Sequence, residues 1–568
     1  MSILTANAPA ARGAVLSLLR RLHFYIGLFV APFIFVAALT GVLYVLTPQI
    51  ENMLYADALT AEPQGAPKPL LAQIAAARAS VGQTEKIYAV RPAPGATDTT
   101  RVQFVSPGLG ASESRSVFID PYTLQVKGDM TVYGTSGVLP LRMWIDQLHR
   151  GLLLGDFGRN YSELAASWLW IAALGGLALW LSARPRRQKK KAQGRFAVAR
   201  HWHITLGLIL LLGLLFFSAT GLTWSQWAGD NVNKMRTALG WLTPQVTTTL
   251  DRSAPAAPVD PHADHHASMG DMDMSGMPVK KTDGNRADGD WDHVLSAARA
   301  AGIEADKLEL RQPKNAGSAW TVTEIDRSWP TRVDAVSVRP DNFAIIDHVR
   351  FKDFPLVAKL TRWGVDAHMG ILFGLANQLI LAAFGLGLCA MIALGYRMWW
   401  LRRPAAPSVN PSQTLVASWL ALPHAWKAAV FAVALALGYC LPVMGVSLLM
   451  FMAVDIVRWE RQDRAAARSP KAPEVQRKIS AQPVAIGRKE KRHFLIAVSI
   501  VALIAGSVIT QAIVGGAIDQ YHIPFSDWSL QLYVTQIMMI VLYTGVFTGL
   551  FTVPLWYFFL GEKSEPQS

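Results

Sequence analysis

Cysteine is almost absent from this chain of 568 residues. The two cysteines, Cys389 and Cys440, both lie inside apolar stretches. This excludes a disulfide framework, a cysteine-rich zinc or iron–sulfur site and a CxxCH motif for covalent haem attachment. Charged residues are also scarce, at 17% against 51% hydrophobic, which excludes a disordered chain and an ordinary soluble enzyme. Any metal centre must therefore use ligands other than cysteine.

Acidic residues are outnumbered by basic ones, 40 to 54, for a formal net charge of +14. Twenty-five of the basic residues lie in four segments beside apolar runs. These segments are 12–21, 183–200, 397–403 and 458–493. By the positive-inside rule all four face the cytoplasm, so the excess charge is chiefly topological. The sequence therefore predicts no nucleic-acid partner.

Apolar runs long enough to cross a bilayer, about 20 residues of helix, lie at 22–46, 163–182, 204–228, 375–400, 494–515 and 532–560. A seventh block, 414–457, holds enough apolar residues for two spans, with a turn expected at 438–442. We therefore predict a polytopic α-helical membrane protein with about eight transmembrane helices. We expect membrane lipid around it, in a bacterial cytoplasmic (inner) membrane, with the N-terminus cytoplasmic. The first span lacks a persuasive cleavage site, so we expect it to be a retained anchor.

The predicted division of the chain follows from these spans. It is a cytoplasmic N-terminus (1–21), span one (22–46), an outer module (48–145), an outer histidine segment with span two (146–182), a basic loop (183–200), span three (201–228), a second outer module (229–362), an outer histidine segment with span four (363–403), a hairpin of two spans (414–457), a basic loop (458–493), two final spans (494–560) and a tail (561–568).

The two outer segments have similar patterns and face the opposite side, the periplasm. In the first, a helix over 70–81 precedes strand-like runs at 87–90, 101–105 and 116–119. In the second, a helix over 291–301 precedes runs at 308–310, 320–323 and 333–338. Each segment is therefore predicted to be a small α+β module.

The two halves of the chain repeat one another. His23, Gly27 and the pair Thr40-Gly41 recur as His203, Gly207 and Thr220-Gly221, at a constant offset of 180 residues. Trp144, His149 and Gly155 recur as Trp363, His368 and Gly374, at a constant offset of 219. The difference of 39 residues must be insertion in the second outer segment. The repeat selects His203 rather than His201, because residues two apart point to different sides of a helix.

Depth in the membrane pairs the four repeated histidines, His23 with His203 on the cytoplasmic side and His149 with His368 on the outer side. Neutral imidazole is a strong axial ligand for haem iron, so each pair is predicted to form a bis-histidine site for haem b, with two haems per chain. Gly27 and Gly207 lie one turn from the inner histidines and leave room for a flat macrocycle. Thr40, Gly41, Thr220 and Gly221 lie about 25 Å farther along, near the outer pair. The alternative is that the histidines cap helices or bind lipid headgroups at the interface.

A run rich in histidine and methionine lies within the inserted length. Its members are His262, His265, His266, Met269, Met272, Met274 and Met277. Imidazole and thioether suit copper, so one hypothesis is copper scavenging. The other is a flexible polar insertion that binds nothing.

At these residues the chain resembles the PepSY-associated transmembrane family, whose members include siderophore-iron reductases of the bacterial inner membrane. The resemblance covers residues 18–403, and the hairpin up to 459 is included in it. It rests on Arg20-Arg21-Leu22-His23 with Thr40-Gly41, Phe118–Thr123, Leu148-His149, His203 with Thr220-Gly221, and His368-Met369-Gly370. Leu124 stands where the family's Asp-Pro-x-Thr-Gly turn has glycine. The last helix pair lies outside the resemblance.

The resemblance implies a duplicated four-helix core that binds haem, periplasmic PepSY modules and electron transfer across the membrane. Electrons would enter at the His23/His203 site, and a ferric siderophore or another ferric complex would be reduced beyond the His149/His368 site. Apart from the haem ligands, no separate catalytic residue stands out. The cytoplasmic segments contain no GxGxxG motif and no P-loop. A quinol or a separate reductase is therefore the expected electron donor.

Two other functions remain open on the sequence. A metal or siderophore transporter would place acidic groups at mid-membrane, but the spans have almost none: Asp455 lies near a cytoplasmic end, and Glu163 is expected to face water. A noncatalytic PepSY regulator would use the spans only as an anchor. The matched histidines favour the haem hypothesis over this one.

Overall fold

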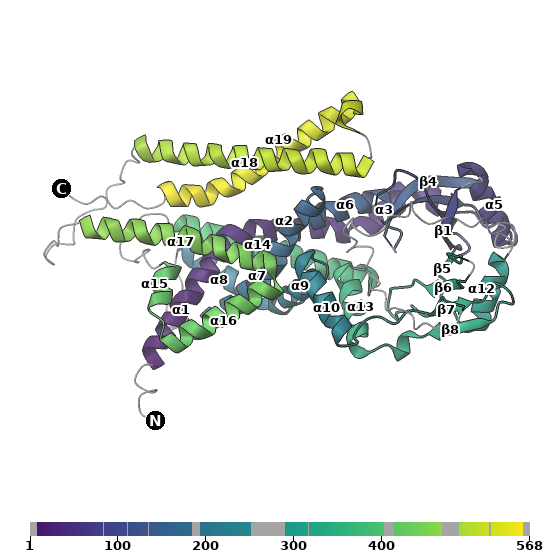
Figure 1. Cartoon of the computed structure of the whole chain (residues 1–568), viewed down its shortest axis with the longest axis horizontal. Coiled ribbons are helices and arrows are strands. Elements are labelled where there is room, and N and C mark those ends of the chain that lie inside the picture. Colours follow the sequence, from purple (N-terminus) through teal and green to yellow (C-terminus); the bar gives the residue numbers. More distant parts are fainter. Residues whose placement is uncertain are drawn as a thin grey trace.

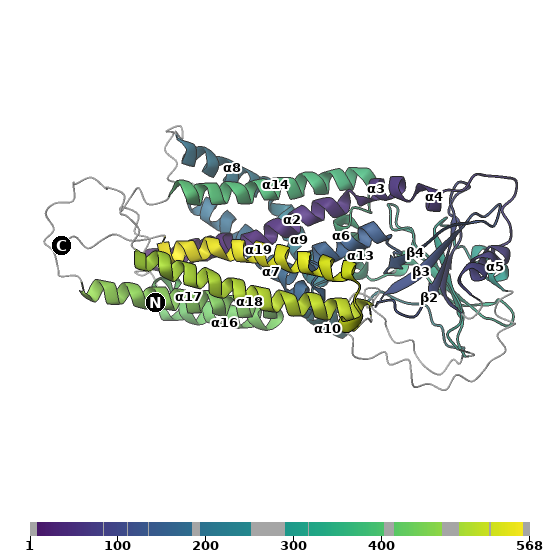
Figure 2. The ribbon, with the colours of Figure 1, turned by 90° about the horizontal axis from the view of Figure 1, so that it is seen from above.

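The computed structural model has a helical bundle at one end and a β-sheet at the other (Figure 1). It describes residues 8–82, 85–110, 112–134, 136–183, 194–250, 290–315, 317–402, 414–468, 488–521 and 524–560. Figure 2 shows the same two ends from above. We call the two ends of the bundle the sheet side and the far side.

Four repeated helical units form the core of the bundle. The first runs from α1 (Ala8–Tyr25) through a π-helical turn η1 (Ile26–Val30) into α2 (Ala31–Val45). The others are α7 (Gly155–Ala183), the pair α8 (Arg195–Ile209) and α9 (Leu211–Thr223), and α14 (Gly374–Leu401). The pair α8–α9 bends by 60° at Leu210, the repeat equivalent of Val30 at the end of the π-helical turn. Both halves therefore interrupt the helix at the same point, seven residues after the inner histidine.

Further helices flank the core. The short α15 (Leu415–Leu420) leads into the hairpin of α16 (His424–Cys440) and α17 (Pro442–Arg468), which turns where the glycine and proline of 438–442 predicted. Asp455 of α17 is fully buried, accepting hydrogen bonds from Tyr25 Oη and from Val416 N. The last hairpin is α18 (Arg488–Tyr521) and α19 (Leu530–Leu560), joined through the 3₁₀ turn η5 (Phe525–Asp527).

Six helices within the described residues are long and apolar enough to cross a membrane, and the bent pair α8–α9 makes seven. The helix α16, with 17 residues, is shorter than the others. A multi-pass membrane protein is therefore confirmed. The predicted count of eight spans stays a prediction, because α16, the first helix of the predicted 414–457 hairpin, is only a shorter apolar helix.

The two predicted α+β modules share one antiparallel sheet of eight strands, in the order β4-β3-β2-β1-β5-β6-β7-β8. The first four are β1 (Lys86–Arg91), β2 (Thr100–Val105), β3 (Glu113–Ile119) and β4 (Val126–Tyr133). The second four are β5 (Leu308–Arg311), β6 (Trp320–Glu324), β7 (Ala335–Val338) and β8 (Ile345–Val349). The modules join where Val90 of β1 pairs with Leu310 of β5.

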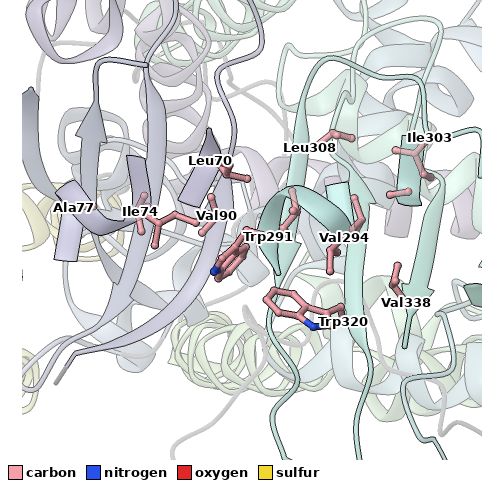
Figure 3. Close-up of a cluster of buried hydrophobic side chains, with 14 of the residues drawn as sticks. Leu70, Ile74, Ala77, Val90, Trp291, Val294, Ile303, Leu308, Trp320 and Val338 are labelled. Carbon is pink, nitrogen blue, oxygen red and sulfur yellow. The ribbon is translucent and has the colours of Figure 1, made fainter. Parts of the chain in front are cut away.

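One hydrophobic core serves both modules. The helices α5 (Leu70–Val81) and α12 (Trp291–Ala300) cover the same face of the sheet, and Asp292 of α12 accepts hydrogen bonds from the first two backbone amides of α5. Figure 3 shows Trp291 between side chains of the first module and those of the second. Full burial of such large side chains stabilises the joined sheet, at about 1.5–3 kcal/mol for a typical apolar side chain.

The turns that close β3 and β7 match each other. Asp120 Oδ1 accepts hydrogen bonds from the amides of Tyr122 and Thr123, and Leu124 adopts φ 64°. Phe343, at the repeat-equivalent position, adopts φ 57°. Leu124 and Phe343 therefore both adopt the left-handed backbone conformation that glycine adopts without strain.

The remaining short helices connect the sheet to the bundle. They are α3 (Thr47–Leu54), α4 (Ala56–Leu59), α6 (Pro140–Gly151), α10 (Trp227–Ala238), η4 (Phe351–Asp353) and α13 (Leu356–His368). The helices α6 and α13 are amphipathic and lead into α7 and α14 through Gly155 and Gly374. Both glycines have positive φ, 55° and 56°, which explains why glycine recurs there.

Candidate functional site

The two outer histidines lie side by side at the sheet side of the bundle. His149 stands two residues before the end of α6, and His368 is the last residue of α13. Their ring centroids are 6.5 Å apart and their planes make an angle of 62°. Phe217 and Trp224 pack against the His368 ring, with centroid distances of 5.0 and 5.6 Å. The pairing by depth thus corresponds to a spatial pair.

A threonine from the repeated Thr-Gly motif holds each outer imidazole. Thr40 Oγ1 lies 3.0 Å from His149 Nδ1, and Thr220 Oγ1 lies 2.7 Å from His368 Nδ1. Each threonine hydroxyl donates its proton to the carbonyl four residues earlier, at 2.8 Å in both cases. Because a hydroxyl has one proton, Oγ1 is left to accept from Nδ1–H. This contact assigns the tautomer and leaves the lone pair of Nε2 available to a metal ion.

One of the two inner histidines is held by a backbone carbonyl instead. His203 Nδ1 donates to Met391 O at 2.9 Å. Ala172 is the repeat equivalent of Met391, but the buried Nδ1 of His23 makes no hydrogen bond within the described residues.

Two glycines that the sequence analysis missed lie against the inner rings. A Cβ atom at Gly176 would be 3.2 Å from His23 Cε1, and one at Gly395 would be 3.5 Å from His203 Cε1. These glycines are separated by the same offset of 219 residues, so extending the repeat along α7 and α14 would have revealed them. Both positions keep the space beside an inner imidazole clear.

The glycines proposed from the sequence differ among themselves. A Cβ atom at Gly41 would lie 3.2 Å from His149 Cε1, so this glycine does adjoin the outer pair. Gly221 faces Ala166 of α7 at 3.2 Å rather than His368. Gly207 faces Met391 Sδ at 3.5 Å, and nothing lies within 4 Å of a Cβ atom at Gly27, where space remains open.

One sequence expectation is wrong. Glu163 does not face water, since its side chain is fully buried. Its carboxylate accepts hydrogen bonds from the amides of Trp227 and Ala228 at 2.8 and 3.1 Å. It therefore binds the first amides of α10, where a negative charge is favoured. His201 is exposed beside Trp202, as the repeat suggested. The run from His262 to Met277 lies outside the described residues.

A chain of charged residues ties the sheet to α13. Arg327 Nε donates to Asp366 Oδ1 at 2.6 Å, and its Nη1 donates to Ser136 Oγ at 2.7 Å. Arg362 lies 3.6 Å from the other oxygen of Asp366, so two guanidinium groups share this buried carboxylate two residues before His368. Two guanidinium groups and one carboxylate therefore lie close to His368 in the fold.

A buried ion pair crosses the seam between the two modules. Arg91 Nε donates to Glu309 Oε2 at 2.9 Å, and Arg91 Nη1 donates to the carbonyl of Ser136. Burial would raise the pKa of Glu309, but the guanidinium groups of Arg91 and Arg311 hold that pKa below its usual value. The seam thus carries an ionised glutamate at neutral pH, linked through Ser136 to Arg327.

The outer histidine pair has the spacing that two ligands of one haem iron would need. No group of three or more histidine, cysteine or acidic side chains that could hold a metal occurs within the described residues. A pair of imidazoles needs a metal that brings its other ligands with it, as haem iron does. Two imidazole nitrogens each about 2 Å from one metal would place the ring centroids about 6 Å apart, and the observed outer separation is 6.5 Å. In three of the four histidines an oxygen atom accepts from Nδ1, and metal-binding histidines usually have such an acceptor.

The comparisons with known proteins identify the part of the chain that carries these residues. The PepSY-associated TM region matches residues 20–402. The chain belongs to the PepSY-associated transmembrane family. The match ends within two residues of the end of α14, so it includes all four histidines, both threonines and both sheet modules, but neither of the C-terminal hairpins.

The last hairpin has relatives of its own. Residues 484–563 match a second family, described as a protein of unknown function (DUF2534). A stretch of 74 residues is 45% identical to the Uncharacterized protein YnaJ of Escherichia coli strain K12, covering 87% of that protein and 13% of this chain. The proteins of the same name from Escherichia coli O6:H1 and O157:H7 match equally. The second family match thus lies beyond the PepSY-associated region and covers the last hairpin.

Proposed function

We propose that this membrane protein binds two haem b groups and carries electrons across the bacterial inner membrane to a ferric complex, with a ferric siderophore as the preferred substrate. The observation that carries the proposal is the placement of the four repeated histidines: the rings of His149 and His368 lie 6.5 Å apart at the sheet side, and His23 and His203 stand at equivalent points of α1 and α8. When bound, haem supplies one-electron redox chemistry that the side chains themselves lack.

The residues of this chain would bind the haem groups and orient the imidazole rings that hold them. His23 and His203 would hold one haem at the far side, and His149 and His368 would hold the other at the sheet side. Thr40, Thr220 and the carbonyl of Met391 accept the Nδ1 protons of His149, His368 and His203, which fixes these three rings and leaves Nε2 of each free to bind a metal. The glycines Gly41, Gly176 and Gly395 keep the ring edges free of side chains.

The sheet side suits an anionic substrate. Arg327 and Arg362 share the carboxylate of Asp366 two residues before His368, and these two guanidinium groups would favour an anion there. Ferric siderophores bind iron through hard oxygen ligands that hold Fe(II) more weakly than Fe(III), so reduction promotes release. The donor on the far side is a quinol or a separate reductase.

Two histidine variants in inverted membrane vesicles test this proposal. The vesicles contain a trihydroxamate ferric siderophore and ferrozine, which detects Fe(II), and NADH reduces the quinone pool through the endogenous dehydrogenases. We expect His368→Ala to keep a reducible inner haem but lose most ferrozine signal. We expect His203→Ala to lose both the reducible haem and the signal.

His201→Ala is the matched control, because His201 lies two residues from His203 and is exposed. It should retain both haems and the full rate. Normal reduction of the ferric complex by both His368→Ala and His203→Ala would show that the histidine pairs are not the path of the electrons.

A further inference from the structure

The hairpin α18–α19 packs on one face of the family core. Ile509 and Ile513 of α18 are buried against Tyr161 of α7 and Leu154 in the turn that follows α6. From α19, Phe547 packs on Phe33 of α2, with ring centroids 6.3 Å apart. We call the surface formed by Phe33, Val36, Leu148, Leu154 and Tyr161 the docking face. The hairpin lies along the side of the bundle with its turn toward the sheet (Figures 1 and 2).

The docking face directly backs the outer histidine of the first half. Tyr161 Oη donates to the carbonyl of His149 at 2.6 Å. The carbonyl of Val36 accepts the proton of the Thr40 hydroxyl, and that hydroxyl holds His149 Nδ1. The hairpin therefore covers residues that position His149, without contributing a ligand of its own.

The second half of the repeat shows what this face is like without a hairpin. The equivalent of Tyr161 is Ile380, which is 67% exposed, whereas Tyr161 is 6% exposed. The equivalent of Leu154 is Phe373, which is 56% exposed, whereas Leu154 is 2% exposed. The repeated fold alone thus leaves this face open, and burial in the first half comes from the hairpin.

The hairpin is also separate from the core in sequence. The PepSY-associated match ends at residue 402, and the second family begins at residue 484. The second family match covers 484–563 alone, and in the Escherichia coli relatives 74 matched residues make up 87% of the length. A hairpin that also occurs as a short protein of its own would give both matches.

We propose that the docking face is a binding surface for a small two-helix membrane protein of the YnaJ type, and that in this chain the partner is supplied in fused form as α18–α19. The interface is held by apolar packing at Ile509, Ile513 and Phe547 rather than by the covalent connection. This inference does not depend on haem binding or on electron transfer.

Cleavage of the folded full-length protein tests the inference. A specific protease site is placed within 469–487, the N-terminus carries one affinity tag and the C-terminus carries another. After cleavage in mild detergent, the N-terminal tag is captured and the retained C-terminal fragment is measured. We expect most of the hairpin to remain bound to the core.

The variants separate packing from mere co-solubilisation in one micelle. Ile509→Ala/Ile513→Ala removes the buried contacts and should lower retention at least tenfold. Ile500→Ala/Ile504→Ala makes the same change at the same spacing on α18, where the side chains are 50% and 60% exposed, and should retain the hairpin as the parent does. Phe33→Ala tests the interface from the core side and should also lower retention. Release of the parent hairpin on cleavage, or equal retention by the two isoleucine pairs, would overturn the proposal.

Discussion

His149 and His368 occupy equivalent positions of the repeat, 219 residues apart, and their ring centroids lie 6.5 Å apart with the ring planes at 62°. Each ring directs Nδ1 to a threonine whose hydroxyl proton is already donated to a helix carbonyl. The threonines can therefore only accept from the imidazole. The geometry leaves two Nε2 atoms as the free ligands of the outer site.

The threonine contact predicts an effect of Thr220→Val on the outer site. Valine has a similar shape but cannot accept the Nδ1 proton of His368, so the ring loses its orientation. We expect the affinity of the outer site for haem b to fall about 10- to 100-fold, as measured by haem titration of the purified protein. Thr220→Ser keeps the hydroxyl and should restore the affinity. An unchanged affinity in the valine variant would mean that Thr220 does not position His368.

The glycines beside the inner rings predict that an added methyl group will disturb the inner site at Gly176 but not at the neighbouring Gly175. Gly176→Ala places Cβ 3.2 Å from His23 Cε1, which is tighter than an ordinary contact, whereas Gly175→Ala places Cβ 3.8 Å from His23 Nδ1. We expect Gly176→Ala to lower the haem content of the inner site while Gly175→Ala leaves it unchanged. The repeat supports this choice, because Gly176 corresponds to Gly395 but Gly175 corresponds to Leu394. Equal effects would contradict a spacing role.

The buried Arg91–Glu309 pair predicts how the sheet responds to acid. A glutamate with a lowered pKa stabilises the fold above its ordinary value of about 4.3, and this contribution is lost as the pH falls through the folded-state pKa. Hydrogen exchange at the amides of β1 and β5 should therefore accelerate as the pH is lowered below about 4. This acceleration is judged after correction for the intrinsic pH dependence of exchange.

The same pair predicts the result of breaking it at neutral pH. Glu309→Leu leaves Arg91 buried without its carboxylate, which costs about 3–5 kcal/mol, and should expose the seam to exchange. Arg91→Met/Glu309→Leu removes both charges and should recover much of the protection. The exposed pair Arg115–Asp129 provides the control: Asp129→Asn should change stability by about 1 kcal/mol or less. A similar loss of stability in Glu309→Leu and Asp129→Asn would show that burial does not make the Arg91–Glu309 pair more important than an exposed ion pair.

Deletion of 262–277 tests whether the run rich in histidine and methionine is peripheral. The run falls in the inserted length of the second half and has no repeat equivalent. We expect the shortened protein to retain its haem content and thermal stability, and to lose whatever copper the parent binds in equilibrium dialysis. Loss of either haem on deletion would place the run in the site.

The sequence predicted those features that depend on strong local periodicity. The helix over 70–81 has the predicted bounds, and the six apolar runs that could be read singly as spans correspond to long helices or to the bent pair. The strands β4 and β8 were missed because both are sheet edges with mixed polar and apolar residues, where burial imposes little alternation. The joining of the modules was also missed, because a seam of one paired residue, Val90 with Leu310, has no signature in sequence.

The candidate site was predictable as a set of residues but not in its contacts. The constant offsets between the two halves identified the histidines and the Thr-Gly motifs, since duplication preserves spacing. From the sequence the motif was expected to make space for a cofactor, whereas in the structure Thr40 and Thr220 form hydrogen bonds with His149 and His368. Glu163 was also expected to face water, because an acid at a helix entrance has no visible partner until α10 is positioned beside it.

The pyridine haemochrome assay, combined with protein quantitation on the purified and haem-supplied protein, tests the central claim most directly. The two histidine pairs and the absence of a CxxCH motif predict non-covalent haem b at two per chain. His149→Ala/His368→Ala should reduce this value to one, because only the inner pair remains. Folded protein that binds no haem, or that retains haem covalently, would contradict the account.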